Sequence, residues 1–79
     1  MINLLIESEN IIKLQILDLS NSEIYDQDLQ ILAKDVKCQQ LIEIYIDNCK
    51  NCSVIGVNHL NLIKNLTFVS AKFIKIKAD

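Results

Sequence analysis

The chain has 79 residues, of which 51% are hydrophobic, with one glycine and no proline. It is therefore one domain at most and contains no long flexible linker. Its net charge of -2 arises from ten acidic and eight basic side chains, which provides no basic surface for nucleic acid. No segment approaches the roughly 18 consecutive apolar residues of a membrane span, and the start lacks a secretion signal. We therefore expect an intracellular, cytoplasmic protein that binds neither nucleic acid nor membrane.

Residues 2–6 have the character of the end of a preceding helix, and a repeated strand pattern follows them. The pattern L-x-x-[LI]-x-[LI]-x-x-[small] opens at Leu14 and again at Leu41. A third copy opens at Ile63 with the same apolar spacing, and Ala71 takes its small position. The offsets of 27 and 22 residues lie in the range of about 20–29 residues found in strand-and-helix repeats. We predict about 2.5–3 repeats, which start near residues 14, 41 and 63 and form one unit over residues 1–79.

Each copy is expected to form one strand of a parallel sheet. Apolar residues two positions apart share one face of a strand. The inward pairs are Leu17 with Leu19, Ile44 with Ile46, and Leu66 with Phe68. Stacked side by side, these pairs would form two apolar ladders. The first two strands are followed by Ser-Asn-Ser and Asp-Asn-Cys, which favour turns.

A helix is predicted after each of these two turns. Asp26 is the expected N-cap of the first helix, whose apolar stripe has the spacing i, i+3, i+4, i+7. That stripe consists of Leu29, Leu32, Ala33 and Val36. Ser53 is the expected cap of a shorter second helix, within which Gly56 costs about 1 kcal/mol relative to alanine. Strand, turn and helix in this order predict a right-handed α/β solenoid with a parallel sheet.

Two segments resemble a known repeat family. The segment LQILDLSNSEIYDQDLQILAK resembles the ribonuclease-inhibitor-like leucine-rich repeats, and CQQLIEIYIDNCKNCSVIGVNHL is similar to their cysteine-containing subtype in F-box substrate receptors. The marked positions of that subtype hold Cys38, Leu41, Ile44, Ile46, Cys49, Gly56, Val57 and Leu60. Cys52 and Val54 depart from it, since isoleucine and aspartate are usual there. The resemblance implies a short leucine-rich-repeat solenoid over most of residues 5–73, and without an F-box segment it does not imply a ubiquitin ligase.

The cysteines allow three interpretations. Cys38, Cys49, Cys52 and His59 form a possible zinc set, because C-x-x-C is a common zinc half-site. The same C-x-x-C between a strand and a helix has a superficial similarity to thioredoxin, although thioredoxin-like folds place a cis-proline beside the disulfide and this chain has no proline. We favour a structural role, since buried cysteine acts as a small hydrophobic residue with a weak S–H donor. We predict no cofactor, no metal and no enzymatic activity; a small zinc-binding protein that uses Cys49 and Cys52 is an alternative.

The outward residues of the strands are expected to form a binding surface on the concave face of the solenoid. Their columns are Ile16, Glu43 and Asn65, then Asp18, Tyr45 and Thr67, then Ser20, Asp47 and Val69. The predicted binding residues are Asp18, Ser20, Glu43, Tyr45, Asp47 and Thr67. Tyrosine is enriched at binding hot spots, and the carboxylates favour a partner with a basic surface. The main functional prediction is a non-catalytic protein–protein interaction module.

The two ends of the array lead to a further expectation. Repeat arrays need at least three repeats and polar caps, and the start of this chain has no obvious cap. The tail alternates Lys75 and Lys77 with apolar residues, and lysines on an edge strand limit further pairing. We therefore expect self-association through uncapped ends, or else a purely structural segment of a larger leucine-rich-repeat protein.

Overall fold

The computed structural model of the chain describes residues 9–75. Its elements are η1 (Glu9–Lys13), β1 (Ile16–Asp18), α2 (Asp26–Lys34), η2 (Val36–Cys38), β2 (Glu43–Tyr45), α3 (Val54–Leu60) and β3 (Phe68–Ser70), where η denotes a 3-10 helix. Strand and helix alternate along the chain, so the predicted α/β class is confirmed. The expectations for residues 2–6 and for Lys77 lie outside the described residues. Within residues 9–75, no helix has both the length and the apolar character needed to cross a membrane.

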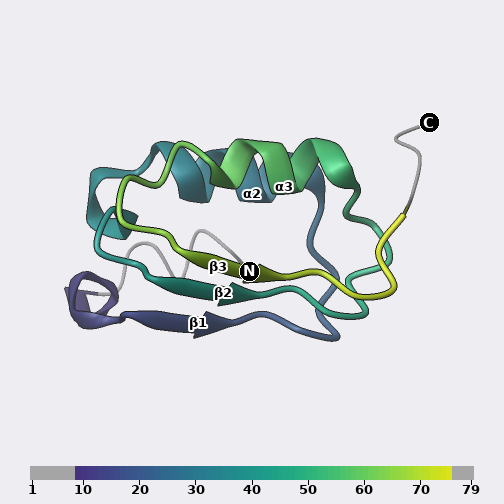
Figure 1. Ribbon diagram of the computed structural model, residues 1–79, viewed down its shortest axis with the longest axis horizontal. Helices are drawn as coiled ribbons and strands as arrows, with labels where there is room; N and C mark the ends of the chain where they lie inside the picture. Colours follow the sequence, from purple (N-terminus) through teal and green to yellow (C-terminus); the bar gives the residue numbers. More distant parts are fainter. Residues whose placement is uncertain (1–8, 76–79) are drawn as a thin grey trace.

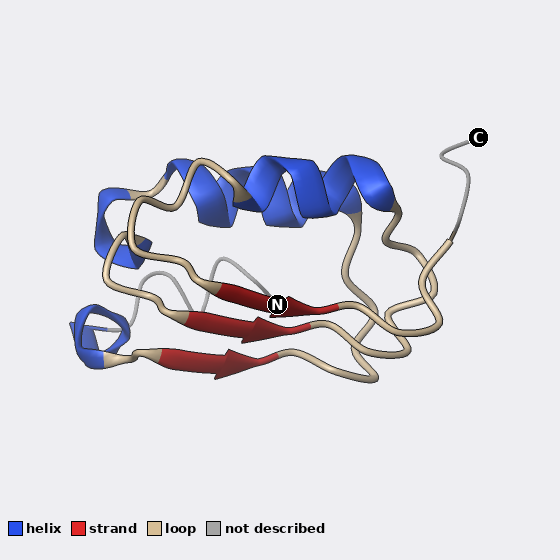
Figure 2. Cartoon of the chain, in the orientation of Figure 1, coloured by secondary structure: helices blue, strands red, loops and turns tan. Residues whose placement is uncertain are grey.

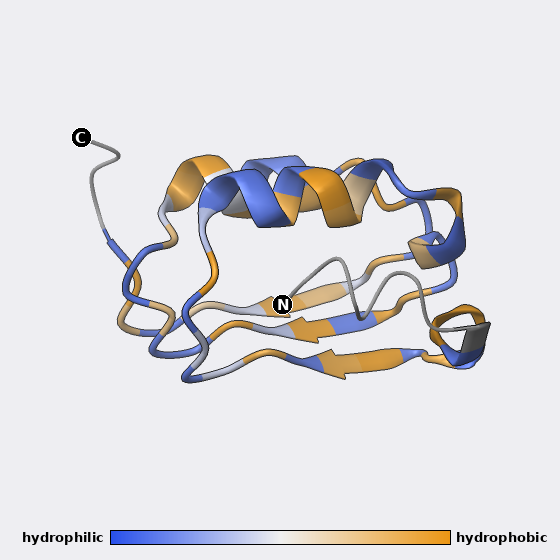
Figure 3. Ribbon diagram, turned by 180° about the vertical axis from the view of Figure 1, so that it is seen from behind, coloured by the Kyte–Doolittle hydropathy of each residue, from blue (hydrophilic) through white to orange (hydrophobic). Residues whose placement is uncertain are grey.

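The three strands form one parallel sheet in the order β1-β2-β3. Helices α2 and α3 lie side by side and cover one face of this sheet, while the other face carries no helix of the described chain (Figures 1 and 2). Hydrophobic residues occur in both layers (Figure 3). The core lies between the layers, where Leu29, Ile44 and Leu60 are fully buried.

The register between β1 and β2 agrees with the prediction, whereas the register between β2 and β3 does not. Leu17 pairs with Ile44, which is the predicted offset of 27 residues. Ile44 then pairs with Val69, at an offset of 25 residues, instead of with Leu66 as predicted. Because alternate side chains of a strand point to opposite faces, this shift of three positions exchanges the two faces of the strand. Phe68 is 50% exposed, whereas Val69 packs against the core.

The observed register aligns five columns of apolar or small residues across three repeat units, which contain β1, β2 and β3 respectively. These columns are Ile11–Cys38–Ile63, Leu14–Leu41–Leu66, Leu17–Ile44–Val69, Leu19–Ile46–Ala71 and Ser22–Cys49–Ile74. The third unit therefore has the same apolar spacing as the first two, but the equivalent of Leu14 and Leu41 is Leu66, three residues later than the predicted start at Ile63. Aligning Ile63 with Leu14 and Leu41, instead of with Ile11 and Cys38, caused the error.

The turn after each strand contains one residue in the left-handed backbone region. These residues are Asn21 with φ of 64°, Asn48 with φ of 62° and Phe73 with φ of 64°. They are separated by the same offsets of 27 and 25 residues as the strands. Asparagine is enriched in this region, while a bulky side chain is an outlier there. The third unit thus has the same turn conformation as the first two, although phenylalanine is unfavourable at its left-handed position.

Phe73→Asn is accordingly expected to stabilise the protein. A left-handed conformation costs a residue with a Cβ roughly 1–2 kcal/mol, and asparagine relieves part of that cost. The ring of Phe73 is 76% exposed, so little buried surface is lost. We expect the free energy of unfolding to rise by about 0.5–1 kcal/mol, measured by urea denaturation. Phe73→Ala is the control, because it removes the ring without favouring the left-handed region; equal stabilities for the two variants would contradict the prediction.

Helix α2 is shorter than predicted. It ends at Lys34, and Asp35 has an extended backbone with φ of -77° and ψ of 129°. Val36, which was predicted to extend the apolar stripe, is 81% exposed and begins η2. Leu29, Leu32 and Ala33 are buried as predicted.

The two predicted helix caps had different outcomes. Ser53 is the N-cap of α3, as predicted, and its Oγ accepts a hydrogen bond from the Ile55 N–H at 3.2 Å. The prediction for Asp26 is wrong, because Tyr25 is the N-cap of α2 and Asp26 is the first helical residue. The Asp26 carboxylate instead accepts from the Ser53 N–H at 2.7 Å and from the Ser53 hydroxyl at 2.5 Å. These bonds join the starts of the two helices.

Candidate protein-interaction surface

The sheet face that is turned away from α2 and α3 gathers most of the predicted binding residues. We call this surface the open face. It consists of Ile16, Glu43 and Phe68 in one row, Asp18, Tyr45 and Ser70 in the next, and Ser20, Asp47 and Lys72 beyond the strands. The first two rows follow from the strand register. In the third row, the Ser20 Oγ accepts from the Asp47 N–H at 3.1 Å, and an Asp47 Oδ accepts from the Lys72 N–H at 2.8 Å.

Five of the six predicted binding residues lie on the open face, and the sixth does not. Asp18, Ser20, Glu43, Tyr45 and Asp47 come from β1, β2 and the turns that follow them, where the predicted register is correct. Thr67 precedes β3, and its hydroxyl donates to the Ile42 carbonyl at 3.3 Å. Ser70 therefore takes the place beside Tyr45 that we predicted for Thr67.

The other two column assignments in the third unit are corrected for the same reason. Asn65 lies before β3, where its side-chain amide donates to the Gln39 carbonyl at 2.9 Å. Val69 turns toward the core. Their places in the columns belong to Phe68, which pairs with Glu43, and to Lys72, whose N–H bonds to Asp47.

An aromatic pair, in which Phe68 is exposed and Tyr45 is partly buried, lies on the open face. The ring centroids of Tyr45 and Phe68 are 5.7 Å apart, and the ring planes are inclined by 57°. This tilted arrangement is one that aromatic rings prefer. Ile16, in the same row as Phe68, is 56% exposed. Phe68 is absent from the predicted binding residues because the predicted register places it in the core.

The Tyr45 ring is fixed by a hydrogen bond to its neighbour two residues earlier. The Tyr45 hydroxyl donates to a carboxylate oxygen of Glu43 at 2.5 Å. This bond raises the pKa of Tyr45, and the negative charges of Glu43, Asp18 and Asp47 add to the effect. Tyr45 is therefore neutral under physiological conditions and presents its ring in one orientation.

Asp47 holds the end of β3 in place. One of its carboxylate oxygens accepts from the Ser70 hydroxyl and from the Lys72 N–H, both at 2.8 Å. The backbone N–H of Lys72 and the Ser70 hydroxyl lower the pKa of Asp47, and the charge of Lys72 acts in the same direction. Asp47 is thus an ionised residue with a structural role, and Asp18 and Glu43 are better positions to test the charge of the open face.

The three cysteines lie in the interior, as predicted. Cys38, Cys49 and Cys52 are free thiols with no solvent exposure. The Cys49 Sγ donates to the Leu19 carbonyl at 3.0 Å, and the Cys52 Sγ donates to the Ile24 carbonyl at 3.4 Å. Each of these thiols therefore satisfies a backbone carbonyl of the preceding unit while filling a narrow space.

Burial also keeps two of the thiols protonated. It raises the pKa of Cys38 to about 11, with a further contribution from the charge of Asp35. It raises the pKa of Cys52 to about 12, with smaller contributions from Cys49 and Asp26. Thiolates, and not thiols, act as nucleophiles and metal ligands. Among residues 9–75, no group of three or more His, Cys, Asp or Glu side chains is arranged to hold a metal ion.

Native protein is therefore expected to react very slowly with the thiol reagent DTNB at pH 8. All three thiols are inaccessible, so their reaction requires opening of the fold. In urea at the same pH, three thiols per chain are expected to react at the rate of free cysteine. Time courses of absorbance with and without urea measure this difference. A thiol that reacts at the free-cysteine rate in native protein would show that the turn containing Cys49 and Cys52 is open.

Comparisons with known proteins add no family assignment to this geometry. A scan against protein-family models, a search of curated proteins and a search of solved structures each gave no match. Residues 9–75 thus form a small α/β domain with a three-stranded parallel sheet, two α-helices on one face, and an aromatic pair among carboxylates on the other.

Proposed function

We propose that this chain is a non-catalytic, protein-binding segment of the leucine-rich-repeat type, which binds its partner through the open face. Three features support the repeat assignment. The apolar columns recur in all three units, the left-handed turn residues share their offsets, and Cys49 donates to the backbone of the preceding unit. In such a solenoid the open face would be the concave surface.

The observation that carries the binding role is the aromatic pair on the open face, in which Phe68 is exposed and Tyr45 is partly buried. Aromatic side chains dominate binding energy at interfaces because they bury large areas at low entropic cost. Here the two rings lie in contact on a sheet face that no described helix covers, and the exposed Ile16 lies in the same row as Phe68, on the other side of Glu43. The hydrogen bond from Tyr45 to Glu43 fixes one of the rings before binding, which lowers the cost of ordering it.

The charge around this patch favours a partner with basic side chains. Asp18 and Glu43 lie in the two rows that contain the aromatic pair. A lysine or arginine of the partner would pair with these carboxylates and lie against an aromatic ring, as in cation–π contacts. Such complementarity mainly accelerates association and selects the partner.

A comparison of matched variants in affinity capture tests the proposal. Phe68→Ala and Tyr45→Ala remove the aromatic pair, and Ile31→Ala is the control, because Ile31 is an exposed apolar residue of α2 on the opposite layer. We expect both aromatic variants to weaken capture of the same partner at least tenfold, which corresponds to about 1.4 kcal/mol. The control is expected to retain full capture. Equal capture by all three variants would exclude the open face as the binding site.

A charge test separates the aromatic contribution from the acidic one. Asp18→Asn and Glu43→Gln are expected to slow association and to reduce its dependence on salt, since the carboxylates act at long range. Surface plasmon resonance with the captured partner measures both rates. A partner whose association rate is insensitive to salt and to both substitutions would contradict the basic character that we propose for it.

A further inference from the structure

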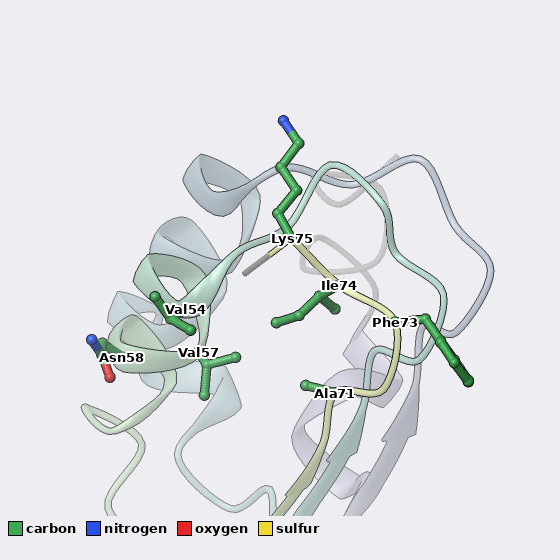
Figure 4. A pocket seen from close by; sticks show the side chains of 7 residues that line it. All are labelled: Val54, Val57, Asn58, Ala71, Phe73, Ile74 and Lys75. Carbon is green, nitrogen blue, oxygen red and sulfur yellow. The ribbon is translucent and has the colours of Figure 1, made fainter. Parts of the chain in front are cut away.

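The β3 end of the described sheet leaves part of its apolar surface uncovered. A groove of about 440 Å³ lies between α3 and the segment after β3. Figure 4 shows Val54, Val57 and Ile74 extending toward this groove from its two sides, while the ring of Phe73 points away. On the central strand the corresponding inward residues, Ile44 and Ile46, are fully buried, whereas Val69 and Ala71 of the third unit are only partly buried.

The sheet also ends at β3 with backbone groups that match those of β1. In the described sheet, the Leu19 N–H donates to the Tyr45 carbonyl, and the Ile46 N–H donates in the same way to the Ser70 carbonyl. Directly after β3, the Ala71 N–H occupies the position of the Leu19 and Ile46 N–H groups. At the other edge of the sheet, the Asp18 carbonyl occupies in β1 the position that the accepting carbonyls of Tyr45 and Ser70 occupy in β2 and β3. The carbonyl of Asp18 in a second copy can therefore accept from the Ala71 N–H, which would continue the parallel sheet.

The charges of the two ends are opposite. Residues 14–40, which contain β1 and α2, have five acidic and two basic side chains. Residues 54–75, which contain α3 and β3, have three lysines, one histidine and no acidic side chain. Oppositely charged surfaces steer two molecules together and select their relative orientation. This difference favours contact between unlike ends and disfavours contact between two β3 ends.

We propose that copies of this chain associate head to tail, with β1 of one copy added in parallel to β3 of the next. The acidic first unit of one copy would then cover the apolar groove and the lysines of its neighbour. Such contact joins two different surfaces, so each pair still has one free end of each kind, and the association continues beyond the dimer. The proposal is argued from the strand edges, the groove and the charges of the two ends, and not from the aromatic pair, so it is independent of the proposed binding function.

Sedimentation equilibrium of the full chain tests this proposal. We expect the average mass to increase with protein concentration past that of a dimer. Raising the salt concentration should reduce this increase, because the Debye length falls from about 10 Å at 0.1 M to about 3 Å at 1 M. A monomer at all concentrations, a mass that stops at the dimer, or an association insensitive to salt would each overturn the proposal.

Charge reversal on exposed side chains provides the matched test. Lys75→Glu alters the β3 end, and Glu23→Lys alters the loop after β1; both side chains are exposed. Each variant alone is expected to associate about tenfold more weakly than the unchanged chain. An equimolar mixture should recover association, since the altered ends are again opposite in charge. Failure of the mixture to recover, with both variants folded by circular dichroism, would contradict the head-to-tail arrangement, and the salt dependence of the unchanged chain tests it without any variant.

Discussion

Gly56→Ala is expected to destabilise the protein by about 2–4 kcal/mol, although alanine is the best helix-forming residue. A Cβ at position 56 would lie 2.4 Å from Asp26 Oδ1 and 2.7 Å from Leu29 Cδ1. The Asp26 carboxylate has little freedom to move away, because it accepts hydrogen bonds from the N–H and the hydroxyl of Ser53. Losing a hydrogen bond to a charged group costs about 1.5–3 kcal/mol, and overpacking against Leu29 costs about 1–3 kcal/mol more. Together these costs exceed the roughly 1 kcal/mol that alanine gains in helix propensity.

Urea denaturation monitored by circular dichroism measures this effect as a lower midpoint at similar slope. Asn58→Ala is the matched control, since Asn58 is an exposed residue of the same helix. It gains helix propensity without approaching α2 and should be neutral or slightly stabilising. If Gly56→Ala were as stable as this control, the close approach of α2 and α3 at Asp26 would be wrong.

The fold class and the first strand pairing could be predicted because the signals are local and repeated. The apolar alternation around Leu17 and Ile44 defines the inward face of each strand, and the offset between the two patterns defines their register. The turn residues Asn21 and Asn48 agree with that offset. In the third unit the corresponding residue is Phe73, which does not signal a left-handed turn in sequence, so nothing local corrected the shifted alignment.

The end of α2 and the role of Asp26 were missed for a different reason. Apolar periodicity alone would allow the helix to continue to Val36, but Asp35 takes an extended conformation and its side chain caps η2 by accepting from the Lys37 N–H at 2.9 Å. Asp26 has the composition of an N-cap, yet its partner is Ser53, 27 residues away. A contact between units decides the role of Asp26, whereas local capping by Asp35 accompanies the end of α2, and apolar periodicity reveals neither.

The candidate site was predictable where the register was correct. Glu43, Tyr45 and the residues of β1 follow directly from alternation along the strand. The main error was to predict that Phe68 is buried, since it supplies the second ring of the aromatic pair. To predict that Phe68 is outward-facing, one must know which alternate residues of β3 face the core, and this depends on how β3 pairs with β2. The apolar patterns of the strands do not identify a binding partner, because that identity depends on the surface of another molecule.

The register of β3 leads to the second large prediction, a contrast between Ile44→Ala and Phe68→Ala. Ile44 is fully buried on the central strand, between Leu17 and Val69. Truncation there removes buried methyl and methylene groups between two neighbouring strands and leaves a cavity, so we expect a loss of about 2–5 kcal/mol. For a domain of this size that loss is a large part of the total stability, which is about 5–15 kcal/mol for globular proteins.

Phe68→Ala should cost only about 1 kcal/mol, because the ring is 50% exposed and loses mainly its contact with Tyr45. The alignment that places Phe68 in the core instead predicts a loss of about 3–5 kcal/mol for this substitution. Urea denaturation of the two variants in parallel therefore distinguishes the two registers. Equal losses would return Phe68 to the interior and remove the aromatic pair from the open face, and with it the main support for the proposed binding role.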